Sequence, residues 1–467
     1  MSIVNIAEVI ESQTLNRKVV SLLLLSFLIM LCDGYDLQTI SFASPSIVAD
    51  WGIEKSAFGF VFTAGALGIM VGGFLFGSLA DRIGRRPSFI IGTLLFSVMT
   101  LSTVLATTVT HLAVFRFIAG LGIGGVTPIC FALNVEYVPK RFRATVVAVV
   151  MIGYMIGTGI GGILAAWLVP QHGWHVLFYI GGVAPLALMP LLVFALPESI
   201  KYLLLSNEHS KSVPLLVNAL CPAAGATSDT RFVLDDTEDQ AKLGSWKEII
   251  LSLFKGRLRR VTPVLWISFI ASNMTVFLLA FWIPLITVST GRSASLAAIG
   301  LTLYSLGGAF GGLLASRIVD MRGVAAVALI PLIASAVIIA TGALEFSDAG
   351  FLTMMGVIGF FVFGGHLALM SVTGMFYPNS NRASGAGWAL SVGKLGAIFG
   401  PALAGFVIAS HPPLIDLFLI AAAPLPIVAL GFFMLGRLGG AQAVATRAED
   451  GGQANVEKPV LVHGSAS

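Results

Sequence analysis

The chain has 467 residues, of which 57% are hydrophobic and 11% are charged, and its formal net charge at pH 7 is +4. Soluble domains carry about 25% charged residues, so this composition indicates a membrane protein and excludes a soluble globular one. The small basic excess requires no nucleic-acid partner, because positive charge in membrane proteins usually marks one side of the membrane.

Twelve apolar runs follow one another along the chain. A spanning helix needs about 20 mainly apolar residues. The first six runs occupy 19–45, 56–79, 88–107, 110–135, 144–168 and 174–196. The second six occupy 261–288, 295–316, 323–343, 349–376, 384–409 and 414–436. The sequence therefore predicts an all-α membrane protein with twelve transmembrane helices.

Polar segments divide these runs into two sets of six. We expect a cytoplasmic N-terminal segment at 1–18, a six-helix bundle at 19–196, a cytoplasmic linker at 197–260, a second six-helix bundle at 261–437 and a disordered cytoplasmic tail at 438–467. No cleavable signal peptide is expected, because the first apolar run is long and lacks a small-residue cleavage site.

Lysine and arginine gather in the loops on one side of the predicted spans. The opposite loops offer little beyond Lys55 and Arg292. Because basic loops stay in the cytoplasm, both termini are expected there. The basic residues that define this side are Arg17, Lys18, Arg82, Arg85, Arg86, Lys140, Arg141, Arg143, Arg317, Arg322, Arg382 and Arg437.

The two halves match each other at one constant offset of 239 residues. This pattern predicts two pseudo-symmetric six-helix bundles related by an axis along the membrane normal, with a substrate site between them near mid-membrane and transport by alternating access. Matching positions include Asp81 and Asp320, Gly84 and Gly323, Arg143 and Arg382, Gly157 and Gly396, and Gly161 and Gly400.

Two aspartates lie inside the first apolar run. Asp33 and Asp36 are three residues apart, which places them on one face of a helix. A carboxylate in the bilayer costs roughly 2.5–3.5 kcal/mol on insertion scales, so this face should meet water or a cation. Arg116 lies at a depth comparable to that of Asp36 in the fourth run. We expect an Asp36–Arg116 or an Asp33–Arg116 pair, acting either as a static ion pair or as a proton switch.

Lys394 is the main candidate for binding a substrate. It lies about ten residues into the eleventh run, ~15 Å deep, where an anionic substrate or another buried acid is its natural counter-ion. His366 also lies near mid-depth, either as a packing residue or as a substrate contact. Aromatic residues in spans usually pack, so the remaining candidates for lining the site are weaker; they are Tyr154, Asn273, Phe277, Trp282 and Tyr304.

No enzyme chemistry is indicated by the sequence. A nucleotide-binding P-loop, a metal-ligand cluster and a nucleophile triad are all missing, and the three cysteines have no paired spacing. We therefore expect no enzyme activity, no cofactor and no metal. Energy for transport must come from an ion gradient or from substrate exchange.

The loop between the second and third runs reads Gly77-Ser-Leu-Ala-Asp81-Arg82-Ile-Gly84-Arg85-Arg86, with a weaker copy around Asp320. Its acid can accept hydrogen bonds at a helix N-terminus and its arginines can bind carboxylates or lipid phosphates, although membrane anchoring is the simpler alternative. Glu136, at the end of the fourth run, is expected to pair with the arginines that follow it. The candidate gating residues are Asp81, Arg82, Arg85, Arg86, Glu136, Arg143, Asp320 and Arg382.

The spacing G-x3-D-R-x-G-R-R in this loop resembles the signature of the major facilitator superfamily. In that superfamily the loop forms a cytoplasmic latch that stabilises the outward-open state. Asp33-Gly34-Tyr35-Asp36, Arg116–Gly125 and Gly385–Gly396 are similar to segments of its aromatic acid/proton symporters. Members of that family import benzoate-type acids, including 4-hydroxybenzoate and protocatechuate, with protons across bacterial inner membranes.

The resemblance implies roles for particular residues. Asp33 and Asp36 would serve proton coupling, and Arg116 and the Asp81 loop would also be required. Many relatives carry arginine where this chain has Lys394, and lysine lacks the bidentate fork, so the substrate geometry is expected to differ.

The leading hypothesis is a monomeric, proton-coupled importer of an aromatic carboxylate in the bacterial inner membrane. Its partners would be the acid, protons and the lipid bilayer. The alternatives are a carrier of another small acid such as muconate, a sugar porter, an exporter of toxic aromatics, and a sensor of aromatic acids. A sugar would not need Lys394, and a sensor needs an output domain larger than the linker at 197–260.

Overall fold

A computed structural model describes residues 3–12, 17–206, 212–220, 227, 230–233, 246–377, 382–411 and 413–438. Within them, twelve helices are long and apolar enough to cross a membrane, which confirms the predicted fold class. The N-terminal bundle consists of α2 (Arg17–Trp51), α3 (Ala57–Ile83), α4 (Arg85–Ser102), α5 (Val109–Glu136), α6 (Arg143–His172) and α7 (His175–Ala195). The C-terminal bundle consists of α11 (Leu258–Ser289), α12 (Ala294–Arg322), α13 (Leu329–Ala343), α14 (Asp348–Phe376), α15 (Arg382–Ile408) and α16 (Leu414–Ala422), whose span continues to Leu438.

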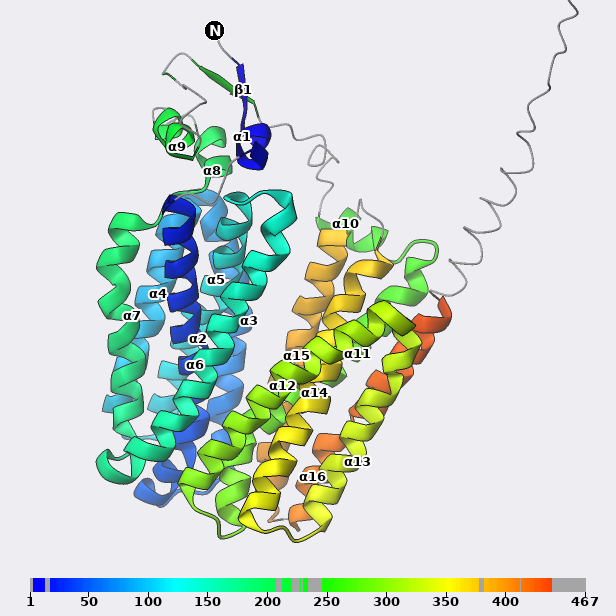
Figure 1. Cartoon of the computed structure of the whole chain (residues 1–467). Helices are drawn as coiled ribbons and strands as arrows, with labels where there is room; N and C mark the ends of the chain where they lie inside the picture. The colour runs from blue at the N-terminus through cyan, green and yellow to red at the C-terminus, as the bar shows by residue number, and fades with distance from the viewer. Residues whose placement is uncertain are drawn as a thin grey trace, which may run out of the picture.

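Short elements outside the spans gather at one end of the molecule, called here the linker end (Figure 1). They are α1 (Ile6–Ser12), α8 (Ile200–Leu205), α9 (Ser212–Leu220), α10 (Trp246–Ser252), and the strands β1 (Ile3–Asn5) and β2 (Arg231–Val233). The two strands pair in parallel, with Ile3 opposite Arg231. The Glu11 carboxylate accepts a hydrogen bond from the Lys140 backbone N–H at 3.0 Å, which ties the N-terminal segment to the N-terminal bundle. The predicted tail lies outside the described residues from 439 onward.

The first span is longer than the sequence predicted, because α2 continues through Pro45 to Trp51. A proline within a helix removes one N–H and leaves the carbonyl four residues earlier without its usual donor. Here the Ser44 hydroxyl donates to the Ser41 carbonyl at 2.8 Å and replaces the missing bond. The helix therefore survives a residue that normally predicts its end.

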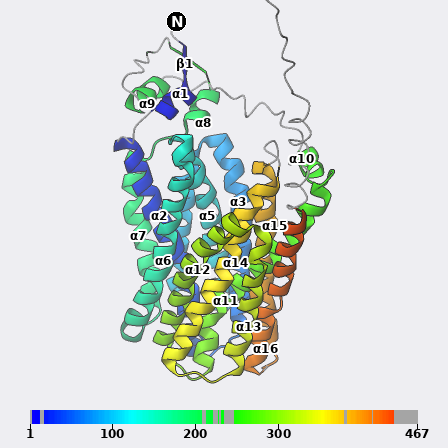
Figure 2. The same cartoon turned by 45° about the vertical axis from the view of Figure 1, so that its right-hand side comes forward.

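The two bundles meet at the end opposite the linker, called here the far end (Figures 1 and 2). The Ser41 hydroxyl of α2 donates to the carbonyls of Ala280 and Phe281 on α11, each at 2.9 Å. Ser41 and Ala280 are 239 residues apart, which is the offset that relates the two halves. Two residues related by a two-fold axis touch only where they lie beside that axis. This contact therefore places the pseudo-symmetry axis between α2 and α11.

Contacts on either side of this axis repeat the symmetry. On one side, α3 packs against α15 so closely that a Cβ on Gly405 would lie 2.7 Å from the Cα of Gly59. On the other side, α12 packs against α6, and the Ser295 hydroxyl donates to the Ala166 carbonyl at 2.9 Å. Ala166 and Gly405 are equivalent positions under the offset. Small residues let the backbones approach at both sites, as they do in other tightly packed membrane helices.

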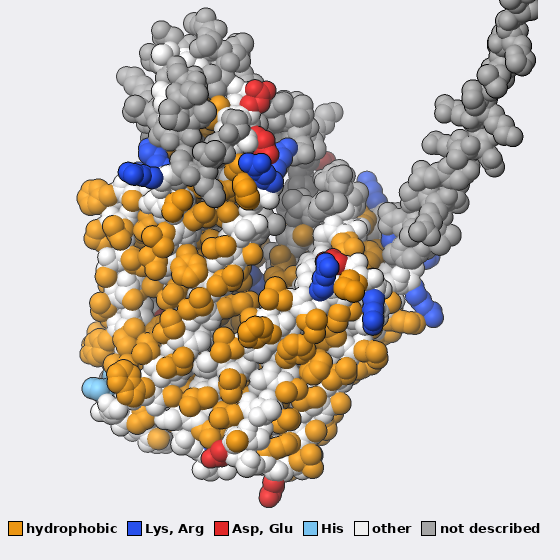
Figure 3. All heavy atoms as spheres, in the orientation of Figure 1, with side chains coloured by type: hydrophobic (Ala, Val, Ile, Leu, Met, Phe, Trp, Pro, Cys, Tyr) orange, Lys and Arg blue, Asp and Glu red, His pale blue; other side chains and the backbone are white. Residues whose placement is uncertain are grey.

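At the linker end the two bundles diverge, and the molecular surface is recessed between them (Figures 1 and 3). Hydrophobic side chains cover the flanks of both bundles, and the lysines and arginines on the visible face gather toward the linker end (Figure 3). The structure is thus closed at the far end and open at the linker end.

Substituting Gly405 by Leu should disfavour this conformation. The new side chain would occupy the space of the Gly59 backbone, so the closed contact between α3 and α15 could not form. Distances between spin labels on the linker-end termini of α3 and α12 should shift toward shorter values as the bundles rock the other way. Gly387→Leu is the matched control on the same helix, because a Cβ at Gly387 has no heavy atom within 4 Å. Identical distance distributions in the two variants would contradict the prediction.

Candidate functional site

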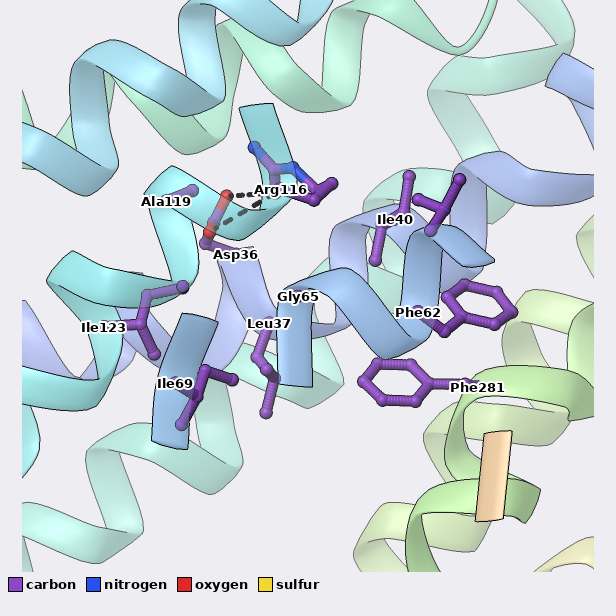
Figure 4. Close-up of a pocket in the computed structure, with 12 residues that line it drawn as sticks. Asp36, Leu37, Ile40, Phe62, Gly65, Ile69, Arg116, Ala119, Ile123 and Phe281 are labelled. Carbon is purple, nitrogen blue, oxygen red and sulfur yellow. Dashed lines mark hydrogen bonds and ion pairs between the residues drawn. The ribbon is translucent and has the colours of Figure 1, made fainter. Parts of the chain in front are cut away.

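Asp36 lies on α2 in a fully buried polar cage within the N-terminal bundle. Arg116 on α5 donates from Nη1 to both carboxylate oxygens, at 3.3 and 3.5 Å. Thr100 on α4 donates to Oδ1 at 2.7 Å. Arg116 and Asp36 are 5% and 0% exposed. Of the two pairs that the sequence left open, the structure contains Asp36–Arg116, drawn with dashed lines in Figure 4.

The arginine has further partners that hold it in place. Its Nη2 donates to the hydroxyls of Thr100 at 3.0 Å and Thr103 at 2.8 Å. The guanidinium carbon also lies 5.3 Å from the centre of the Phe178 ring, which adds a cation–π contact. A buried charge pair is most stable when its remaining donors and acceptors are satisfied, and the threonines satisfy the Nη2 group of Arg116 here.

Asp33 occupies a separate buried position one turn earlier on α2. Its Oδ2 accepts a hydrogen bond from Thr127 of α5 at 2.8 Å, and its Oδ1 is buried with no partner among the described residues. At the neighbouring Gly34, the α2 backbone packs directly against the Tyr154 carbonyl of α6. Asp33 therefore sits between three helices and has a free acceptor in an apolar interior.

The C-terminal bundle holds a related pair at the symmetry-equivalent positions. Ser272 on α11 and Nδ1 of His366 on α14 are 2.9 Å apart. Adding 239 to Asp33 and to Thr127 gives these same two residues. The imidazole packs edge-on against Phe269, with ring centroids 6.1 Å apart. Sequence reasoning missed Ser272 and Thr127, although the constant offset could have found them.

Lys394 extends from α15 across to the N-terminal bundle. A Cβ placed on Gly73 of α3 would lie 3.4 Å from its Nζ and 3.4 Å from the Gly124 carbonyl oxygen of α5. The side chain is only partly buried, and no described residue forms an ion pair or hydrogen bond with it. The ammonium of Lys394 thus lies between the two bundles without a counter-ion among the described residues.

The weaker candidates fall into two groups. Asn273 is 8% exposed and lies against Gly393, next to Lys394, and both Tyr154 and Phe277 are partly buried. Trp282 and Tyr304 are fully buried in the closed far end, where they donate to the carbonyls of Pro401 and Val276. In this conformation the second group is not open to a ligand, and substrate contact by all five stays a prediction.

The signature loop is held within the N-terminal bundle. The Glu198 carboxylate accepts hydrogen bonds from the backbone N–H groups of Arg85 and Arg86 at 2.9 and 3.1 Å, where it caps the N-terminus of α4. Glu136 pairs with Arg85 and accepts a hydrogen bond from the Ser199 hydroxyl at 2.6 Å. The sequence predicted that Glu136 would pair with the arginines that follow it, and this was wrong because the start of α4 lies closer in space.

The other predicted gating residues whose side chains the structure describes form no contact between the bundles here. Asp81, Arg82 and Asp320 are exposed, and Nε of Arg143 is buried without a partner among the described residues. The Arg82 carbonyl accepts a hydrogen bond from the Tyr202 hydroxyl at 3.1 Å. The Arg382 side chain lies outside the described part of the chain. Among the described residues, these side chains form no latch between the halves at the open linker end.

A small cavity of about 30 Å³ adjoins the Asp36–Arg116 pair (Figure 4). This volume holds one or two water molecules and is too small for an aromatic ring. A ligand of aromatic size therefore does not fit in this cavity.

Comparison with known proteins was made for both sequence and structure. A family model described as Major Facilitator Superfamily matches residues 26–291. The chain is similar to the gallate transporter of Pseudomonas putida, with 33% identity over 86% of this chain and 88% of that protein. It is also similar to the 4-hydroxybenzoate transporter of Acinetobacter baylyi, with 31% identity over 80% and 81% of the two chains. The benzoate transport protein of the same organism is 30% identical over 90% of each.

Solved structures show the same fold. The crystal structure of a D-xylose-proton symporter aligns with a TM-score of 0.67 and 18% identity, covering 89% of this chain and 97% of the other. A bacterial homologue of the human lysosomal transporter Spinster, in an inward-facing conformation, aligns with a TM-score of 0.68 and 17% identity over 91% and 98%.

Removing the Asp36 carboxylate should destabilise the protein strongly. Asp36→Ala leaves a buried arginine without its counter-ion, which costs about 3–5 kcal/mol. Asp348→Ala is the control, because Asp348 pairs with Arg292 while its own side chain is 70% exposed, and such pairs contribute about 0–1 kcal/mol. Thermal unfolding of the purified variants in detergent would measure the difference. Equal melting temperatures would show that the Asp36–Arg116 pair does not stabilise the bundle.

Proposed function

Because the chain belongs to the major facilitator superfamily, and within it to the aromatic acid transporters, we propose that it imports a small aromatic carboxylate with protons by alternating access. The named relatives transport gallate, 4-hydroxybenzoate and benzoate. The protein is a multi-pass membrane protein, and we place it in a bacterial inner membrane with its linker end in the cytoplasm. All the groups of the proposed mechanism come from one chain, so a monomer is sufficient.

The observation that carries the proposal is the position of Lys394. Its ammonium extends from α15 to Gly73 on α3 and has no counter-ion among the described residues. A carboxylate bound there would contact both bundles at once. If the bundles rock relative to each other, a substrate that contacts both favours conformations in which α15 and α3 lie close together at the binding site. The neighbouring Asn273 and His366 offer hydrogen bonds to the ring substituents.

The proton is assigned to the aspartates of α2. Protonation of Asp36 removes its charge, so the attraction to Arg116 is lost and the two charged hydrogen bonds weaken. Asp33 lies one turn away, with an acceptor that has no partner among the described residues. Proton binding on the N-terminal bundle and anion binding at Lys394 then act on the same interface between the bundles.

Gradient-driven uptake tests the whole proposal. Proteoliposomes should accumulate radiolabelled 4-hydroxybenzoate when an inward proton gradient is imposed, and should only equilibrate without it. Asp36→Asn should abolish accumulation but keep counterflow, which exchanges labelled for unlabelled acid and needs no net proton movement. Accumulation by a correctly inserted Asp36→Asn variant would rule out this residue as the proton site.

Lys394→Gln should separate charge recognition from ring recognition. The neutral glutamine keeps much of the side-chain length but cannot attract a carboxylate, so affinity for 4-hydroxybenzoate should fall by about tenfold or more, equivalent to ~1.4 kcal/mol. Affinity for the neutral 4-hydroxybenzamide should change little. Binding to the purified protein by calorimetry would compare the two ligands. Equal losses for both would exclude Lys394 as the counter-ion.

A further inference from the structure

The small cavity beside Asp36 has one polar wall. Besides its contacts with Asp36 and the threonines, Arg116 has a buried Nε–H with no partner among the described residues. A buried donor without a partner costs about 1–3 kcal/mol. Arg116 and Asp36 both line the cavity, and about 30 Å³ is enough for a water molecule that accepts from the arginine.

The outer wall of this cavity is built from both bundles. Phe62 of α3 stacks on Phe281 of α11, with ring centroids 4.9 Å apart and planes 9° from parallel. The two residues are 1% and 3% exposed. Both rings line the cavity (Figure 4). Each lies nearer to the far-end terminus of its helix than Asp36 does to that of α2. Because the rings belong to different bundles, any motion that separates the bundles at the far end must separate them.

The inner wall is different, because it belongs to the N-terminal bundle alone. Ile69 of α3 and Ile123 of α5 line the cavity on this side, and Ile69 is partly exposed. Ile123 follows Arg116 along α5 toward the linker end. In the present conformation the cavity is therefore bordered by stacked rings of both bundles toward the far end and by aliphatic side chains of one bundle toward the linker end.

We propose that this cavity is a water site that relays the proton to and from Asp36, and that the Phe62–Phe281 stack is its outer lid. The inference rests on the proposed proton coupling and adds the route and the residues that control it. When the far end opens, the rings separate and water reaches Asp36. A hydronium ion then transfers its proton to a carboxylate oxygen, forming an O–H bond and leaving water. When the rings stack again, the proton leaves toward the linker end, past Ile69 and Ile123.

Truncating either ring should uncouple the transporter. Phe62→Ala and Phe281→Ala leave the cavity open on both sides, so protons should cross without substrate. Collapse of an imposed pH gradient, followed with a pH-sensitive dye inside proteoliposomes, should be several-fold faster than for the parent chain. Phe96→Ala is the matched control, because Phe96 is also fully buried in the N-terminal bundle but does not line the cavity. A leak no faster than that of Phe96→Ala overturns the proposal.

Two further measurements keep the outcome decisive. Counterflow of labelled 4-hydroxybenzoate shows that each variant is folded. If the alanine variants fail to insert, Phe62→Leu and Phe281→Leu replace them. Because leucine keeps most of the side-chain volume, their proton leaks should lie between those of the parent chain and those expected for alanine. In the double variant Phe62→Ala/Asp36→Asn the leak should disappear, because the water route needs the carboxylate. A leak that persists there overturns the relay. If the parent chain moves no protons with the substrate, the proposed function itself fails, which is a separate result.

Discussion

The cost of a charge in a bilayer governs how the spans are arranged. The buried carboxylate of Asp36 is tolerated because Thr100 of α4 and Arg116 of α5 bond to it, and Thr103, which follows α4, accepts from the arginine. These contacts fix the rotation of three helices about their axes. Two other ionisable groups in the spans also lie at polar or partly exposed positions: Asp33 accepts from Thr127, and Lys394 is partly exposed next to Gly73 of the other bundle. The cost of burying a charge in the bilayer thus restricts where ionisable residues can lie within the spans.

Pseudo-symmetry shows how the two halves divide this chemistry. Under the 239-residue offset, Asp36 corresponds to Thr275 and Arg116 to Met355, so the C-terminal bundle lacks the ion pair. Lys394 corresponds to Met155, so the N-terminal bundle has no counterpart of this lysine. The helix arrangement is repeated in the two halves, but the Asp36–Arg116 pair lies in the N-terminal bundle and Lys394 lies in the C-terminal bundle. In the proposed function, the coupling between proton and substrate must therefore cross the interface between the bundles.

The contacts described at the far end of that interface are uncharged. The closed far end depends on a serine that donates to backbone carbonyls near the axis, two close glycines and one pair of stacked rings. None of these contacts buries a charge, so separating them carries no electrostatic penalty of the kind that holds Asp36 in place. The N-terminal bundle, by contrast, is fastened internally by the Glu198 and Glu136 contacts at the start of α4. Two bundles joined at the far end mainly by apolar packing and by hydrogen bonds to backbone carbonyls fit a rocking motion.

The sequence alone determined the twelve spans, the repeat and the few ionisable residues inside the membrane. Hydropathy and charge are local properties of a segment, and a bilayer accepts only apolar helices of about this length. The sequence could not show whether Asp33 or Asp36 pairs with Arg116, and it predicted the wrong partners for Glu136. The residues of the cage are up to 80 positions apart in the chain, so only helix packing and rotation decide which of them meet. The water-sized cavity and its aromatic lid likewise exist only once three helices of one bundle meet one of the other.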